Sequence, residues 1–283
     1  MPTPTLGPVV RFSRPSAYPL KSLGIAGWSG VIGVPIDPKP RRKVIHFVRH
    51  AEGFHNVDAE VMKKPEGLDA QLTDEGKRQC NLLSKSIAHL EPDLIVTSPL
   101  TRTVQTALFS LPFQLGRHTP LVALEHVRET VNYLCDARRP LSAIVGELSS
   151  MGLELDTTSG CAHNHDEIWA RYERKHGSAQ AFTQHRESAD LAALAVRARR
   201  AFAWLAARPE KEIVVVTHSA FLWNVLNMAR VGKRAGVEAV CDYGGDFELE
   251  GWLSAKFDNC EMRTVVCDFP EEIRLPPEEE GQS

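Results

Sequence analysis

Short apolar runs alternate with amphipathic segments along most of the chain. Runs rich in Val, Ile and Leu, typical of buried strands, occur at residues 44–48, 93–96, 121–124, 213–217 and 263–269. Apolar residues at helical spacing occur over residues 73–90, 101–109 and 189–208 and in the segment that starts at Ser219. Thr73 is placed to cap the first of these helices. The alternation predicts an α/β fold, a three-layer α/β/α sandwich with a mostly parallel central sheet.

Three other segments lack this alternation. Residues 1–36 contain no Asp or Glu but do contain Arg, Ser and Pro, so residues 1–42 are either a transit segment or a surface arm. Residues 132–184 show no firm period and are predicted to form a lid insertion. The Pro- and Glu-rich residues 271–283 are expected to be a flexible acidic tail. The predicted domain therefore spans residues 43–270.

Composition and charge narrow the possible partners. With 43% hydrophobic and 24% charged residues, the chain can bury a sizeable core. A net charge of -3 does not favour nucleic-acid binding, and no apolar run is long enough to cross a membrane. The six cysteines include no CxxC pair and are interpreted as reduced thiols. We expect a cytoplasmic protein, or an organellar one if the first segment is a transit peptide.

Polar residues follow three of the predicted strands. Arg49 and His50 follow the first, Ser98 and then Arg102 follow the second, and His218 follows the strand over 213–217. Parallel sheets bind ligands at the carboxyl ends of their strands, so these side chains should meet there. Each pattern alone also fits a core pair or a helix cap.

The residue types suit chemistry on phosphate. The planar guanidinium group of arginine can donate two hydrogen bonds to phosphate, so Arg49 and Arg102 are predicted phosphate ligands. A neutral imidazole can attack phosphorus, and a second, protonated imidazole can hold the transferring oxygens. We assign the first role to His50 and the second, catalytic and phosphate-binding, to His218.

Four motifs occur in order: FVRHAEGFHN, LTDEGKRQ, SPLTRTVQTA and VVVTHSAFL. Together they resemble the histidine phosphatase superfamily, with its phosphoglycerate mutase-like fold, over roughly residues 43–269. The resemblance implies that His50 becomes phosphorylated and that Arg49, Arg102 and His218 complete the phosphate pocket. It also implies that Asn56 contacts the substrate phosphate or its neighbour. Ala51 stands where the family often has glycine.

The segment LEHVRETVNYLCDARRP resembles the plant and fungal phosphomutase-like branch of that superfamily, as does FDNCEMR near the end. This resemblance makes Glu129 the catalytic general acid and base, with Glu125 as the reserve candidate. Arg138 and Arg139 either bind a second anionic group of the substrate or form structural ion pairs.

The predicted activity is hydrolysis of small phosphate monoesters through a phosphohistidine, without a metal or cofactor. The run from Cys161 to Asp166 is interpreted as a loop, because zinc ligands usually have wider paired spacing. Arg197, Arg199 and Arg200 are expected to be a solvated helix face. A phosphoglycerate mutase-type phosphotransferase and a non-catalytic interaction module on the same fold are the alternatives. The sequence predicts neither the particular substrate nor the oligomeric state.

Overall fold

The structure, a computed structural model, describes residues 6–15, 41–178 and 186–275. Most of the predicted arm, residues 179–184 of the predicted lid and residues 276–283 of the predicted tail lie outside these residues. The strands are β1 (Val10–Ser13), β2 (Arg42–Arg49), β3 (Leu94–Thr97), β4 (Leu121–Ala123), β5 (Glu212–Thr217), β6 (Cys241–Asp242) and β7 (Met262–Asp268).

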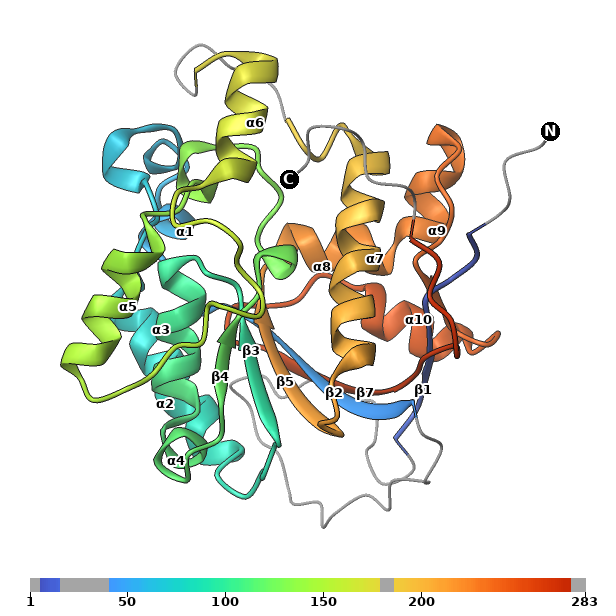
Figure 1. Cartoon of the computed structure of the whole chain (residues 1–283), viewed down its shortest axis with the longest axis horizontal. Coiled ribbons are helices and arrows are strands. Elements are labelled where there is room, and N and C mark those ends of the chain that lie inside the picture. The colour runs from blue at the N-terminus through green and yellow to red at the C-terminus, as the bar shows by residue number, and fades with distance from the viewer. Residues whose placement is uncertain (1–5, 16–40, 179–185, 276–283) are drawn as a thin grey trace.

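The helices connect and cover these strands (Figure 1). The α-helices are α1 (Phe54–Val57), α2 (Asp74–Ser86), α3 (Thr101–Ser110), α4 (Pro112–Gly116), α5 (Leu141–Ser150), α6 (Glu167–His176), α7 (Leu191–Ala207), α8 (Ser219–Leu226), α9 (Met228–Val231) and α10 (Phe247–Ser254). The 3-10 helices are η1 (Val61–Lys63), η2 (Pro65–Gly67), η3 (Glu125–Val127), η4 (Leu134–Asp136) and η5 (Gly232–Ala235). None of the helices in the described ranges is long and apolar enough to span a membrane.

The described strands form one sheet in the order β4-β3-β5-β2-β7-β1-β6. The neighbours β4, β3, β5 and β2 are parallel, and β7 runs antiparallel to both β2 and β1. The carboxyl ends of the four parallel neighbours therefore lie side by side, and the prediction of a mostly parallel sheet is confirmed.

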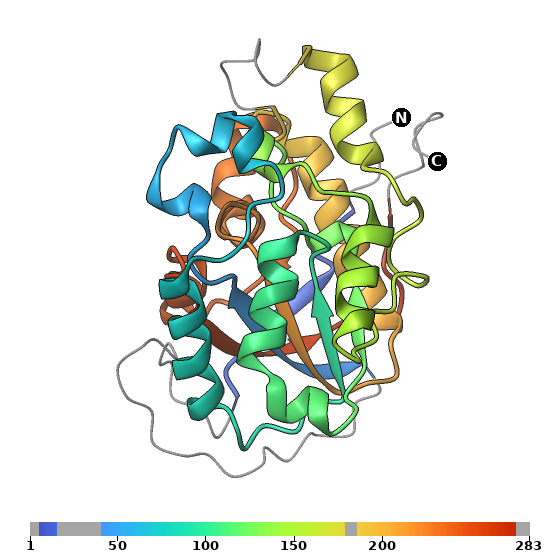
Figure 2. The same ribbon diagram turned by 90° about the vertical axis from the view of Figure 1, so that its left-hand side faces the viewer.

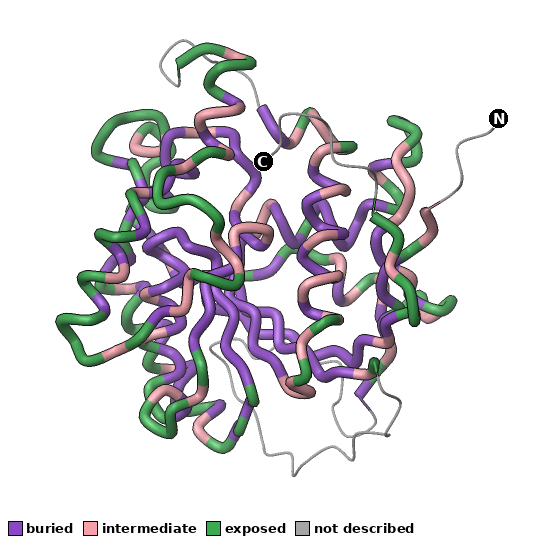
Figure 3. Tube along the Cα trace, in the orientation of Figure 1, coloured by how far each residue is buried: buried purple, intermediate pink, exposed green. Residues whose placement is uncertain are grey.

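Alternate residues of a strand contribute side chains to two separate cores, because successive side chains point to opposite faces of the sheet. Ile213 and Val215 pack in the core that contains residues of α7, α8 and α10, while Val214 and Val216 pack with residues of α2, α3 and α5. Figure 2 looks onto the layer of α2, α3 and α5 with the sheet behind it. The strands are buried and the outer helix faces are exposed (Figure 3). The three-layer α/β/α fold follows from these two cores.

Two features of the fold were not predicted from the sequence. Val10–Ser13 adds strand β1 to the sheet, where it pairs with both β7 and β6. In the segment predicted as a lid, the chain forms η4, α5 and α6 between β4 and α7. The predicted domain limits remain predictions.

Candidate active site

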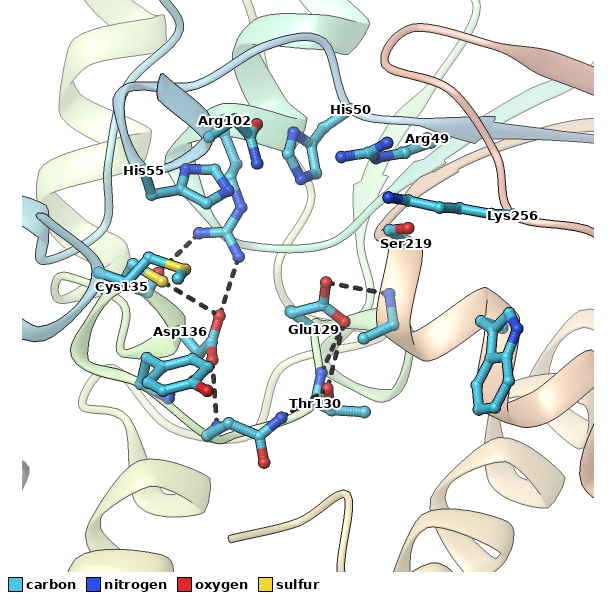
Figure 4. A pocket seen from close by; sticks show the side chains of 16 residues that line it. Arg49, His50, His55, Arg102, Glu129, Thr130, Cys135, Asp136, Ser219 and Lys256 are labelled. Carbon is cyan, nitrogen blue, oxygen red and sulfur yellow. Dashed lines mark hydrogen bonds and ion pairs between the residues drawn. The ribbon is translucent and has the colours of Figure 1, made fainter. Parts of the chain in front are cut away.

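The polar residues at the three strand ends meet around one cavity of about 430 Å³. The backbone N–H of His50 donates to the carbonyl of Thr217 at 2.9 Å, which ties the end of β2 to the end of β5. The imidazole of His218 is hydrogen-bonded to Ser98 Oγ, at the end of β3, at 2.8 Å. The convergence expected from the sequence is therefore present in the structure. Figure 4 shows the side chains that line the cavity.

His50 lies on the cavity wall and is 1% exposed. Its Nδ1 lies 2.7 Å from the carbonyl oxygen of Ala51, so Nδ1 carries the proton and the lone pair is on Nε2. Burial, and next the positive charge of Arg102, hold the pKa of His50 well below its ordinary value. The ring is therefore neutral near pH 7, as a nucleophile must be.

Arg49 and Arg102 supply positive charge beside His50. Arg49 Nη1 donates to the carbonyl of Phe257 at 2.8 Å, while its buried Nε has no hydrogen-bond partner among the described residues. Arg102, in the first turn of α3, donates to the Cys135 carbonyl at 2.6 Å and to Asp136 Oδ1 at 3.2 Å. These contacts fix both guanidinium groups and leave N–H donors for an oxyanion, because a guanidinium has five.

His218 lies beside the nucleophile but behind the cavity wall. Its ring centroid is 5.1 Å from that of His50, and it is fully buried. Its Nδ1 accepts a hydrogen bond from Arg102 Nε at 3.3 Å, so the proton is on Nε2, which faces Ser98. Burial, and next the charge of Arg102, hold the pKa of His218 well below its ordinary value. His218 is therefore neutral in this pocket, and its role as a protonated ligand of the transferring oxygens stays a prediction.

Glu129 lies on the cavity wall, in the loop that follows η3. Its Oε1 accepts hydrogen bonds from the backbone N–H groups of Thr130 and Phe221, both at 2.8 Å, and its Oε2 accepts one from Ala220 at 3.2 Å. Burial, and next the negative charge of Asp136, raise the pKa of Glu129 despite these hydrogen bonds. A carboxyl group with a raised pKa in a cavity beside His50 is suited to donate a proton.

Arg138 and Arg139, for which a second anion site and structural ion pairs were the two alternatives, are both held in ion pairs. Arg138 is buried, binds Glu125 at 3.1 Å and donates to the carbonyls of Asn164 and His165. Neither Arg138 nor Glu125 lines the cavity. Sequence alone could not decide this, because the carbonyls that hold Arg138 are some 25 residues away along the chain.

Arg139 is also held outside the cavity. It pairs with Asp69 at 3.2 Å and with Glu147 at 2.6 Å, and it donates to Thr101 Oγ1 at 2.9 Å. Both arginines therefore have the structural role, which was the second of the two alternatives.

The expectation of a solvated arginine face on α7 is wrong. Arg197 is buried, pairs with Glu187 at 2.9 Å and donates to the carbonyls of His126 and Arg128. Arg199 is buried as well and donates to the carbonyls of Gly7 and Ala239. Because Arg197 holds the carbonyl just before Glu129, it supports the loop that carries the candidate acid.

Asn56 lines the cavity as expected, and His55 and Asp136 are among the cavity residues that were not predicted although they lie inside the quoted motifs. Asn56 Oδ1 accepts from the backbone N–H of Gly53 at 3.0 Å. His55, its neighbour in HAEGFHN, has its ring centroid 5.3 Å from that of His50. Asp136, in CDARR, accepts from the backbone N–H groups of Asn132 and Tyr133. In the sequence, the signal that could have indicated both residues is that each is a polar residue inside a quoted motif.

The buried imidazoles should make folding sensitive to acid. Burial lowers the pKa of His55 from 6.5 to about 2, so the folded state takes up the proton far less readily than the unfolded chain. The stability contributed by neutral His55 is full above pH 6.5 and is lost progressively as the pH falls toward 2. Between pH 7 and pH 5 this group alone should cost about 2 kcal/mol of unfolding free energy.

Urea unfolding at the two pH values checks this expectation. In His55→Gln the loss of unfolding free energy between pH 7 and pH 5 should be smaller by that amount, whereas His163→Gln, at an exposed position, is the control. An equal acid dependence in His55→Gln and in the unchanged protein would contradict the account.

The loop from Cys161 to Asp166 forms no metal-ligand cluster. Among the described residues, no group of three or more His, Cys, Asp and Glu side chains is placed to hold a metal ion. Asp166 instead caps α6 and pairs with Arg128 at 2.6 Å.

Several known proteins resemble this chain in sequence or in fold. Residues 45–139 match the histidine phosphatase superfamily (branch 1). Phosphoglycerate mutase-like protein 1 of Arabidopsis thaliana is 28% identical over 276 residues, covering 85% of this chain and 91% of that protein. A Schizosaccharomyces pombe protein with the name "Probable phosphatase" is 25% identical over 179 residues, covering 62% of this chain and 74% of that protein. The structure of phosphoglycerate mutase from Bacillus anthracis gives a TM-score of 0.46 at 11% identity, covering 80% of this chain and 88% of the other.

These sequence similarities support the histidine phosphatase superfamily for this chain, and with it phosphatase or mutase-like activity. The chain has a three-layer α/β fold with a mostly parallel sheet.

Proposed function

We propose that the protein is a phosphatase that hydrolyses phosphate monoesters through a phosphohistidine on His50. The observation that carries the proposal is the shared cavity of a neutral imidazole, two fixed arginines and a carboxyl group whose pKa is raised. Phosphoryl transfer needs mainly positioning and stabilisation of charge on the oxygens, which Arg49 and Arg102 supply.

In the first step the substrate phosphoryl group binds between Arg49 and Arg102. The Nε2 lone pair of His50 attacks phosphorus, the bond from phosphorus to the ester oxygen breaks, and that oxygen takes the proton of Glu129. The leaving alkoxide needs this proton because it is otherwise a poor leaving group.

His218 takes part once an anion is present. Its Nδ1 and Arg102 Nε lie 3.3 Å apart. A phosphate dianion beside them favours the protonated imidazole, after which both nitrogens donate to the same oxygen. His218 thus carries charge only in the complex, where it offsets the charge on the transferring oxygens.

In the second step the Glu129 carboxylate takes a proton from water, whose oxygen attacks phosphorus. The bond from phosphorus to Nε2 breaks, its electron pair returns to His50, and inorganic phosphate leaves. Glu129 ends protonated, ready for the next cycle.

Hydrolysis is favoured over a mutase reaction by the charges around the cavity. A mutase acting on a phosphoglycerate must also hold the substrate carboxylate, yet Arg138 and Arg139 are bound to Glu125, Asp69 and Glu147 outside the cavity. Beyond Arg49 and Arg102, this leaves Lys256 as the one further Lys or Arg among the described residues that line the cavity. We therefore place the reaction among phosphoric monoester hydrolyses.

Two assays on the same preparation test the choice. Inorganic phosphate released from a panel of phosphate monoesters should rise with time, while 3-phosphoglycerate should give little or no 2-phosphoglycerate. Interconversion of the phosphoglycerates at a rate above phosphate release from every ester of the panel would show a mutase instead.

Activity should survive exhaustive chelation. Arg49, Arg102 and protonated His218 supply the positive charge that metal ions supply in many other phosphatases. Phosphate release after prolonged dialysis against EDTA, followed by removal of the chelator, should equal that of the untreated protein. Loss of turnover that one divalent ion alone restores would oppose the proposed mechanism.

A further inference from the structure

The cavity has two chemically different sides (Figure 4). Arg49 and Lys256 lie on one side with His50, and Lys256 is next to Arg49 and Ser219. Glu129 faces them across the cavity, and Arg102 reaches from the side of His50 to Asp136, with which it pairs at 3.2 Å. The phosphoryl group belongs on the cationic side, so the rest of the substrate lies toward the carboxyl groups.

Glu129 fixes where the leaving group begins, because the ester oxygen must reach its carboxyl. That carboxyl accepts from the backbone N–H groups of Ala220 and Phe221, in the first turn of α8. Trp223 is three residues after Ala220 and therefore lies on the same side of the helix, one turn further. It lines the cavity, and 39% of it is exposed.

The loop that carries Glu129 supplies a second aromatic residue. Tyr133 lines the cavity, and its backbone N–H donates to Asp136 Oδ2 at 3.0 Å, which fixes the loop at this point. A leaving group bonded to the ester oxygen at Glu129 thus meets aromatic side chains from two segments, α8 and the loop before η4.

The same region is unfavourable for an anionic leaving group. An anionic leaving group would lie beside the Glu129 carboxylate once that residue has given up its proton. Among the described residues that line the cavity, the cations are Arg49, Arg102 and Lys256; Arg102 already pairs with Asp136, and Arg49 and Lys256 lie with His50 on the phosphoryl side. A volume of about 430 Å³ is within the range of sites that bind small molecules.

We propose that the substrates are phosphate monoesters whose leaving group carries an uncharged aromatic ring, which packs on Trp223 and Tyr133. This proposal rests on the proposed phosphatase function and narrows its substrate class. It separates the protein from enzymes that act on phosphoglycerates and simple sugar phosphates, because those leaving groups are anionic or strongly hydrated.

A matched pair of substrates tests the proposal. 2-Phenylethyl phosphate and ethyl phosphate both leave as primary alkoxides, so both need the proton of Glu129 and they differ in the ring. We expect kcat/KM to favour the phenylethyl ester by about tenfold or more, and Trp223→Ala to remove about tenfold of that preference. Trp223→Leu, which keeps apolar volume without the ring, should also reduce it.

The control is Phe113→Ala, at an exposed aromatic position on α4 that does not line the cavity. It should leave the preference as it is in the unchanged protein. Equal kcat/KM for the two esters, or a preference that both Trp223 variants retain in full, would overturn the aromatic subsite.

Binding of two phosphonates separates this subsite from the proposed function, since phosphonates are not hydrolysed. Calorimetry should show tighter binding of 3-phenylpropylphosphonate than of propylphosphonate, with the difference reduced in Trp223→Ala. If this holds while neither ester is hydrolysed, the phosphatase function fails and the subsite stands. If both esters are hydrolysed equally and the two phosphonates bind equally, the function stands and the subsite fails.

Discussion

Replacing His50 by alanine is expected to lower phosphatase turnover by on the order of 10⁴-fold or more, because no covalent intermediate can then form. His50 is held by the carbonyl of Ala51, with its lone pair on Nε2. The two arginines and Glu129 remain in the variant but have no nucleophile to assist. Phosphate release from an alkyl phosphate, measured at saturating substrate, checks the expectation.

The matched control is His163→Ala, which removes an exposed histidine outside the cavity. It should keep normal turnover. Thermal unfolding of both variants establishes that the fold is retained. Near-normal turnover in His50→Ala would mean that the reaction uses another nucleophile, such as water alone.

Glu129→Gln is expected to lose on the order of 10² to 10⁴ in kcat/KM on an alkyl phosphate and much less on p-nitrophenyl phosphate. Glutamine keeps the size of the side chain but cannot donate the proton that a basic alkoxide needs. A nitrophenolate leaves without one. The ratio of the two kcat/KM values, measured for the variant and for the unchanged protein, reports this dependence directly.

The pH dependence of alkyl phosphate hydrolysis should be set by the protonation of Glu129. Because the pKa of Glu129 is raised, its acidic form persists to a higher pH than in an ordinary glutamate, and kcat/KM on the alkyl phosphate should fall as the pH rises through that pKa. The fall should be absent from the small remaining activity of Glu129→Gln.

Glu125→Gln is the control, since Glu125 was the reserve candidate for the acid. The structure pairs it with Arg128 and Arg138, outside the cavity. We expect Glu125→Gln to lower stability without changing the ratio between the two leaving groups. A leaving-group dependence at Glu125 and none at Glu129 would transfer the acid role.

The parts of the fold that were predictable are those in which local pattern and burial agree. Strand β5 contains four consecutive apolar residues, from Ile213 to Val216, which are buried between the two cores, so its local sequence predicts its position in the fold. Thr73 caps α2 as expected, with Oγ1 accepting from the backbone N–H of Gly76 at 3.0 Å. Strand β1, by contrast, is four residues long and is stabilised by pairing with residues more than 200 positions away. Pattern alone cannot report such a contact.

Some residues of the site could likewise be predicted from the sequence, and others could not. His50, Arg102 and His218 could be placed because each follows the end of a parallel strand, where the topology brings side chains together. Buried ion pairs are different, because their partners are distant in sequence and carry no local pattern. Arg197 was therefore taken for a surface residue, although it holds the loop of Glu129 through Glu187 and two carbonyls.

The central claim is that the phosphoryl group is transferred to His50, and a rapid-quench experiment with ³²P-labelled substrate tests it most directly. Denaturation within the first turnover should trap label on the protein, in a form stable to alkali and lost in acid, as a phosphorus–nitrogen bond requires. Peptide mapping should place the label on His50, and His50→Ala should carry none. Turnover without any trapped label in Glu129→Gln as well as in the unchanged protein, or label on another residue, would contradict the account.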